Sequence, residues 1–221
     1  MPRYRVRFSK DGPARFFSHL DLVRTSERAM RRAGLPVAFS QGFHPHPLFS
    51  FAAPLPVGIA GENEYLELEL EKNIPTKEIL SRLSLVFPEG IQIKEIWPVN
   101  DDPPSLMAAL EKASYKVEIE LSRVLTEEEL KRLIRSFLAL DLIEVTRKKK
   151  DRFHKRNIRP GILSLQGRVK GEKMILEMEL QAGSTGNVRP EEVLESFLKK
   201  NELFVFFETG TIKRMGLFFK N

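Results

Sequence analysis

The sequence predicts an α+β protein of two tandem ferredoxin-like domains, each with the element order β-α-β-β-α-β and an antiparallel sheet. Three observations lead to this prediction. Segments that alternate apolar and polar residues are typical of half-buried strands, and they occur in both halves of the chain. Segments with apolar residues at helical spacing separate them, and the same order of segments occurs twice. We expect domains at residues 1–98 and 114–221, joined by a linker at 99–113 that contains one short helical turn.

The first domain begins with a strand at 3–9, in which arginines alternate with apolar residues. Ser18, with Asp21 three residues later, predicts the start of a helix, and Gly34 predicts its end. A short strand at 37–40 is expected to follow this helix.

A long loop rich in Gly, Pro, His and Phe is expected at 41–61. The alternation of residues 64–71 predicts the next strand. Pro75 is favoured in the first turn of a second helix, and residues 91–96 alternate again as a strand.

The second domain repeats this order. Residues 115–121 alternate as a strand, and Thr126 with Glu129 predicts a capped helix. Pro190 opens the second helix of this domain. The remaining strands are expected at 142–146, 174–180, 204–207 and 212–219.

The arginines of the first strand are expected to be structural. In a ferredoxin-like sheet the first and third strands are neighbours, so these arginines face glutamates across the open face. Each pair of opposite charges contributes about 0.2–1 kcal/mol. The two sets are Arg3, Arg5 and Arg7, and Glu67, Glu69 and Glu71.

Positive charge is concentrated in two blocks. The whole chain carries +6, but residues 1–60 alone carry +6 and residues 147–170 carry +9, whereas 61–146 carry −8. Together the two blocks can form a phosphate-binding surface for RNA, and the alternative is a pair of solvated surfaces. Phe153 and His154 lie among the cations of the second block and offer stacking platforms for unpaired bases. The residues expected to contact phosphates are Arg24, Arg28, Arg31, Arg32, Lys148, Lys149, Lys150, Arg152, Lys155 and Arg156.

The long loop contains an unusual motif of two histidines between prolines. Its residues are Gly42, Phe43, His44, Pro45, His46 and Pro47. Either histidine, or His19 on the first helix, is a candidate for acid–base catalysis. The three histidines lack a nearby carboxylate, so we expect no metal and no other cofactor. The alternative is a surface loop made rigid by its prolines.

Several classes of protein are excluded or disfavoured. The chain has no cysteine, which excludes disulfides, zinc thiolates and iron–sulfur clusters. It has no phosphate-binding loop with a lysine and no visible Ser-His-Asp arrangement. No apolar run approaches the length of a membrane helix, and residues 1–10 lack a signal-peptide core. We therefore expect a cytoplasmic protein without membrane contact, and no catalysis by the chain on its own.

Several long motifs run through both halves of the chain. They are residues 8–12, 15–22, 28–29, 31–36, 40–47 and 54–58 in the first half, and 157–160 and 186–192 in the second. These motifs resemble the radical SAM-linked protein family, a domain of unknown function, and the resemblance covers nearly the whole sequence. Members of that family occur beside or fused to a radical SAM enzyme, which implies that this chain is an accessory partner of such an enzyme.

The predicted architecture also resembles that of endoribonucleases that process CRISPR repeats. Such enzymes often have a histidine on or near the first helix, a position that His19 matches. Residues 209–216 depart from the Gly-rich loop of these enzymes. Three hypotheses follow: an RNA-binding accessory protein of a radical SAM enzyme, a metal-independent endoribonuclease using His19 or His44, and a protein–protein adaptor.

Overall fold

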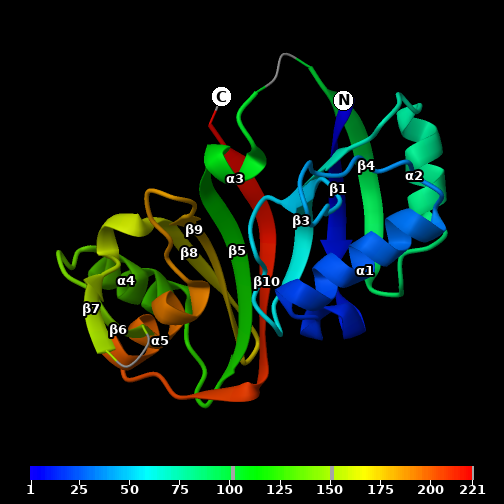
Figure 1. Cartoon of the computed structure of the whole chain (residues 1–221). Helices are drawn as coiled ribbons and strands as arrows, with labels where there is room; N and C mark the ends of the chain where they lie inside the picture. Colours follow the sequence, from blue (N-terminus) through cyan, green and yellow to red (C-terminus); the bar gives the residue numbers. More distant parts are fainter. Residues whose placement is uncertain (101–102, 150–151, 221) are drawn as a thin grey trace. The chain divides into compact units, whose positions relative to one another are not determined.

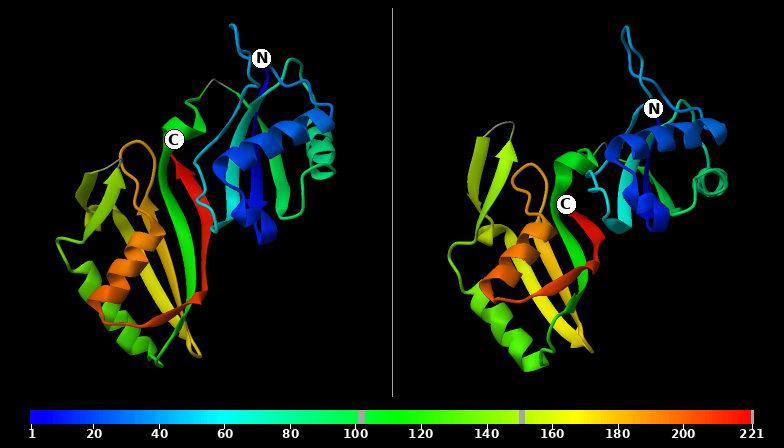
Figure 2. Two further views of the ribbon diagram at one scale, coloured as in Figure 1. Left: turned by 60° about the horizontal axis from the view of Figure 1, so that its bottom comes forward. Right: turned by 90° about the horizontal axis from the view of Figure 1, so that it is seen from below.

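The chain folds as an α+β protein whose strands pair in a largely antiparallel manner (Figure 1). The computed structural model describes residues 1–100, 103–149 and 152–220. These residues form two units: Met1–Leu110 with the end of the chain from Gly216, and Glu111–Met215. Each unit has helices on one face of its strands (Figures 1 and 2).

In the first unit β1 pairs with β3 and β4, and β2 pairs with the far side of β3. The elements of this unit are β1 (Arg3–Lys10), η1 (Gly12–Phe16), α1 (His19–Arg32), β2 (Phe49–Phe51), β3 (Ala60–Glu69), α2 (Thr76–Ser84), β4 (Ile91–Val99) and α3 (Leu106–Ala109).

Two local signals of the first unit are confirmed, the alternation of β1 and the start of α1. Alternate residues of β1 are buried, and they pack with apolar residues of β3, α1 and α2 in one core. Ser18 and Asp21 form a capping box, because the Ser18 hydroxyl accepts from the Asp21 amide at 3.2 Å and the Asp21 carboxylate accepts from the Ser18 amide at 3.1 Å. The residue pattern therefore determined both the buried face of the strand and the start of the helix.

The arginines of β1 have structural partners on the open face of the sheet. Arg3 lies opposite Glu69 in the ladder, and Arg5 lies opposite Glu67, with which it forms an ion pair at 3.0 Å. Arg7 differs from the expectation, because it pairs with Glu95 of β4 at 2.9 Å. The neighbours of β1 on both sides thus supply the carboxylates.

The strand predicted at 37–40 is wrong. Val37 and Phe39 form only isolated bridges, whereas β2 lies within the segment predicted as a loop. The physical reason is the proline content, since Pro36 and Pro47 cannot donate hydrogen bonds to a continuous ladder. The Phe-Ser-Phe sequence of β2 has no proline and alternates as a short strand requires.

In the second unit β5 and β8 pair with β9 on its two sides, and β10 lies beside β5. Phe137 and Phe197 join the two helices of this unit at a ring distance of 5.4 Å. The elements are β5 (Leu110–Leu121), α4 (Glu127–Leu138), β6 (Glu144–Lys149), β7 (Arg152–Asn157), η2 (Arg159–Gly161), β8 (Ile162–Lys170), β9 (Lys173–Gln181), α5 (Pro190–Lys200) and β10 (Val205–Phe219).

The strand predicted at 142–146 corresponds to β6, but its partner is β7 in a separate two-stranded sheet. The strand beside β9 is β8, which the pattern did not predict. An irregularity between Ile162 and Ser164 breaks the period of two in β8. Gly167 stands at a position of β8 that faces α4. A Cβ there would lie 2.8 Å from Ile134, so glycine replaces the apolar residue that would have marked the strand in the sequence.

The helical turn predicted within the linker at 99–113 is α3. Strand β5 begins at Leu110, inside that linker and before the predicted strand at 115–121. The two closing strands predicted at 204–207 and 212–219 are a single strand, β10. Near the end of β10, Phe219 packs on Tyr65 of β3 at a ring distance of 5.4 Å.

Gly90 is required where the turn before β4 meets the end of β1. Its φ is +86°, and a Cβ there would meet the Asp11 carbonyl oxygen and lie 2.9 Å from the Ala14 Cβ. Gly58 has nearly the same φ, +87°, with nothing within 4 Å of a Cβ. We expect Gly58→Ala to cost about 1–2 kcal/mol of unfolding free energy. Gly90→Ala should cost about 1–3 kcal/mol more, because the added methyl overpacks the turn.

Chemical denaturation of both variants measures this difference. Equal losses of unfolding free energy would show that backbone conformation alone, and not the close approach to Asp11, makes glycine necessary at position 90.

Candidate nucleic-acid interface

Most cations of the second basic block lie on two paired strands, β6 (Glu144–Lys149) and β7 (Arg152–Asn157), which we call the basic ribbon. In its register Arg147 lies opposite His154 and Lys148 opposite Phe153. All residues of β7 are exposed. Since side chains alternate between the two faces of a strand, Lys148, Phe153 and Lys155 share one face and Arg147 and His154 share the other. These cations therefore project to solvent from an ordered two-stranded element.

The base of the ribbon is held by residues 157–159. The Asn157 side chain accepts from the Ile143 amide at 3.0 Å and donates to the Asp141 carbonyl at 3.1 Å. Ile143 and Ile158 are buried beneath it. The Arg159 guanidinium donates to the carbonyls of Leu138, at the end of α4, and Ile162. Residues 157–160, which carry part of the family resemblance, thus attach the ribbon to α4 and β8.

The flank of the ribbon is held by Arg147. Its guanidinium forms a bidentate pair with the Glu192 carboxylate, with both N–O distances at 2.6 Å, and donates to the Asn187 carbonyl at 2.8 Å. The pair is largely shielded from solvent, with side-chain exposures of 21% and 14%. Its hydrogen bond with Glu192 raises the pKa of Arg147 above the ordinary value, so this cation stays charged and is committed to α5. Residues 186–192, the other carrier of the resemblance in the second half, form this attachment.

The exposed cations of the ribbon remain available to a ligand. Lys148 lies on the face with Phe153, whereas Arg152 and Arg156 lie, by the same alternation, on the face with His154. Among the described residues, Lys148, Arg152 and Arg156 form no ion pair, whereas Lys155 pairs with Glu144 at 2.8 Å. The Lys155–Glu144 pair is exposed, so it is weak and exchanges readily with an incoming anion. Phe153, in the middle of this set, is 72% exposed. The predicted contact Lys150 lies outside the described residues, and Lys149 is described only as the last residue of β6.

The arginines predicted to bind phosphates on the first unit lie on α1 and are exposed. Arg31 pairs with Glu27 at 3.0 Å, one helical turn away. Arg32 donates to the Val86 carbonyl at 2.6 Å. Arg24 and Arg28 project from the same helix without an ion pair to any described residue. Two of the four predicted contacts on α1 are therefore engaged in contacts within the first unit.

The predicted histidines lie at different places in the first unit. The His19 ring packs edge-on against Phe51 at 5.8 Å. The His46 Nδ1 lies 2.8 Å from the Ser40 hydroxyl, which orders the base of the loop. His44 and Phe43 are exposed at its tip, where Phe43 is fully accessible. A role for these histidines in acid–base chemistry stays a prediction.

Within residues 1–100, 103–149 and 152–220, no three His, Cys, Asp or Glu side chains are grouped as a metal site requires. Over the same ranges, no helix has the length and apolar composition needed to cross a bilayer.

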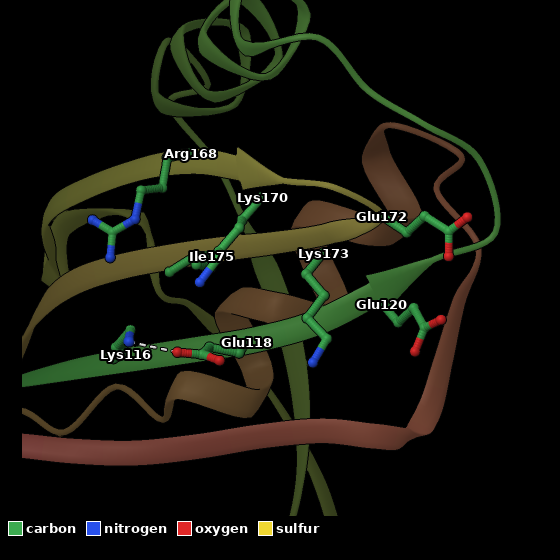
Figure 3. A pocket seen from close by; sticks show the side chains of 8 residues that line it. All are labelled: Lys116, Glu118, Glu120, Arg168, Lys170, Glu172, Lys173 and Ile175. Carbon is green, nitrogen blue, oxygen red and sulfur yellow. Dashed lines mark ion pairs between the residues drawn. The ribbon is translucent and has the colours of Figure 1, made fainter.

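A hollow of about 560 Å³ on the open face of β5, β9 and β8 is the main competing site (Figure 3). Lys116 pairs with Glu118 at 2.5 Å, and this hydrogen bond lowers the pKa of the Glu118 carboxyl. Four cations are balanced there by three carboxylates of the lining and by Glu177, which pairs with Arg168. This balance disfavours a polyanion. The hollow is lined by Lys116, Glu118, Glu120, Arg168, Lys170, Glu172, Lys173 and Ile175.

Sequence reasoning missed the structural roles of Arg147 and Arg159. Both belong to the basic block, and nothing local distinguishes them from the exposed cations. The partner of Arg147 is 45 residues away in the sequence, so only the folded chain shows that this arginine positions the ribbon and is not a ligand contact.

Fold and site together define an α+β protein that carries a basic two-stranded ribbon. The chain belongs to the family of uncharacterized proteins conserved in bacteria, DUF2344, whose model matches residues 3–190. The description of that family names no activity and no partner. No curated protein matches the chain.

Solved structures add a distant likeness in fold. One similar chain comes from the crystal structure of a Cbf5-Nop10-Gar1 complex, with 11% identity, a TM-score of 0.50 and coverage of 97% of this chain and 48% of that chain. This chain thus spans about half the length of that one. An unknown protein from Galdieria sulphuraria has 12% identity and covers 97% of this chain and 99% of that chain. Its TM-score of 0.29 is too low to indicate a shared fold.

We expect the Arg147–Glu192 pair to stabilise the ribbon. Arg147→Ala removes a bidentate pair from a shielded position, so the second unit should lose about 1–3 kcal/mol of unfolding free energy. Backbone amides of β6 and β7 should exchange with solvent faster than in the unchanged protein. Lys155→Ala is the control, because its exposed pair contributes at most about 1 kcal/mol.

Denaturant titration and hydrogen exchange measure the two effects. If ribbon amides of the Arg147→Ala protein remain as protected as before, the base at Asn157 and Arg159 alone holds the ribbon.

Proposed function

We propose that this chain is an RNA-binding accessory protein and that the basic ribbon is its principal RNA contact. The observation that carries the proposal is the combination of Lys148, Arg152 and Arg156, unpaired among the described residues, on an element anchored by Arg147 and Arg159. Cations on an ordered backbone lose less conformational entropy on binding phosphates than cations on a disordered loop do. The same arrangement is absent from the open sheet face, where charges are balanced.

Counterion release is the physical basis of this affinity. Each phosphate that a cation neutralises releases condensed counterions, and the binding constant then falls with salt. Arg24 and Arg28 of α1 are proposed as additional phosphate contacts, because they are exposed and have no ion pair with a described residue.

The architecture proposed for both units is ferredoxin-like. Two features support it in the first unit: the order of elements and the strand order β4-β1-β3-β2. In the second unit the strand order β10-β5-β9-β8 is equivalent, if the basic ribbon is an insertion between α4 and β8. Both correspond to the order 4-1-3-2 of one β-α-β-β-α-β motif.

The exposed cations predict a specific salt dependence. Changing Lys148, Arg152 and Arg156 together to Gln should weaken RNA binding and make the slope of log K against log salt less steep by about 2, since each phosphate contact on a single strand contributes about 0.7. The matched control changes Lys131, Arg132 and Arg135 of α4 to Gln. These residues are exposed in the same unit, and the net charge changes equally.

Fluorescence anisotropy with labelled RNA over a range of salt measures both slopes. We call the protein with Lys148, Arg152 and Arg156 changed to Gln the ribbon-cation variant. If it and the α4 variant lose RNA affinity equally, net charge, and not the ribbon, attracts RNA. Arg24→Gln combined with Arg28→Gln tests α1 in the same titration.

The partner we propose is a radical SAM enzyme, to which this chain presents its RNA. The support is the resemblance of the motifs in both halves of the sequence. These residues include no cysteine, so the ligands of an iron–sulfur cluster would come from outside them. Affinity capture of the tagged chain from its native cells, after nuclease treatment, should recover an iron–sulfur protein of that class. Recovery of none, or recovery that nuclease abolishes, would contradict a direct partnership.

A further inference from the structure

The two faces of the basic ribbon differ in chemistry. Arg147 is held against α5 by Glu192 and Asn187, so the face that it shares with His154 is turned toward the body of the second unit at this point. The opposite face points away, and it carries Phe153 with Lys148 directly across the ladder and Lys155 two residues along. An aromatic ring therefore lies between two cations on the outward face.

Packing within the ribbon does not account for Phe153. Its ring is 72% exposed, and its cross-strand neighbour is a lysine. The aromatic contacts of the described residues involve other rings, and the cation–ring contact among them joins Arg15 to Phe16. A ring with this exposure contributes little to folding, and it is available to a flat ligand.

Building on the RNA-binding function proposed above, we infer that the outward face binds unpaired nucleotides, with a base stacked on Phe153 and the adjoining phosphates on Lys148 and Lys155. Directly opposed side chains on paired strands lie about 5 Å apart at Cβ. Side chains two residues apart on one strand lie about 7 Å apart. One nucleotide can therefore contact the ring and a lysine together. Bases inside a duplex are already stacked on one another, which excludes them from the ring.

Phe153 therefore selects single-stranded segments, whereas the cations alone accept any phosphate backbone. A short oligouridylate should bind more tightly than a duplex RNA of equal length at the same salt. Phe153→Ala should weaken binding of the oligouridylate roughly 5- to 150-fold, the range of one lost base stack. Its salt slope should stay unchanged, because no phosphate contact is removed.

Matched variants separate stacking from apolar contact. Phe153→Leu keeps an apolar side chain without a ring and should bind as weakly as Phe153→Ala. Phe153→Trp should retain binding, and its fluorescence should be quenched by the oligouridylate but not by the duplex. Trp97 is the single tryptophan of the unchanged chain. The fluorescence of the unchanged protein therefore gives the background to subtract from that of Phe153→Trp.

The outcomes distinguish this inference from the proposed function. If Phe153→Ala and Phe153→Leu bind the oligouridylate as tightly as the unchanged protein, while the ribbon-cation variant loses binding, the stacking inference is overturned and the proposed function stands. Binding of the duplex as tight as that of the single strand also overturns it. If the unchanged protein binds neither RNA, both the inference and the proposed function fail.

Discussion

A hairpin of two strands cannot bury an apolar face of its own, and isolated hairpins are at best marginally stable in water. This constraint governs how the second unit is built. The ribbon is almost wholly exposed, so its order depends on Asn157 and Arg159 at its base and on Arg147 at its flank. In both attachments, guanidinium or amide side chains donate hydrogen bonds to backbone carbonyls or to a carboxylate. Polar contacts here replace the apolar packing that holds the other strands.

The candidate interface differs from the open sheet face in how many of its cations have a partner, and not in how many cations it holds. On the open sheet face Lys116 and Arg168 are matched by Glu118 and Glu177. On α1 a carboxylate or a carbonyl engages two of the four predicted arginines. The cations of the ribbon have few such partners among the described residues. A surface is suited to a polyanion when its cations are ordered but uncompensated, and the ribbon meets both conditions.

The elements that could be predicted are those with strong local signals. Alternation identified the buried face of β1, and the Ser18–Asp21 pair identified the start of α1. Proline at 190 identified the first turn of α5. Prediction failed at β8, where an irregularity and Gly167 break the alternating pattern, and at β2, where prolines on both sides indicated a loop. At β8 a close approach to α4, and at β2 a single short pairing, take the place of the periodic burial that makes a strand recognisable in the sequence.

The sequence by itself determined the α+β class, the capped helices, the concentration of positive charge in residues 147–170 and the absence of cysteine chemistry. Each of these follows from composition or from contacts within a few residues. Only the tertiary structure decided that most of these cations lie on an ordered ribbon and that Arg147 anchors it while Lys148 and Phe153 face solvent. The physical reason is distance along the chain: Glu192 lies 45 residues from Arg147, and no local pattern records a pairing that only folding brings about.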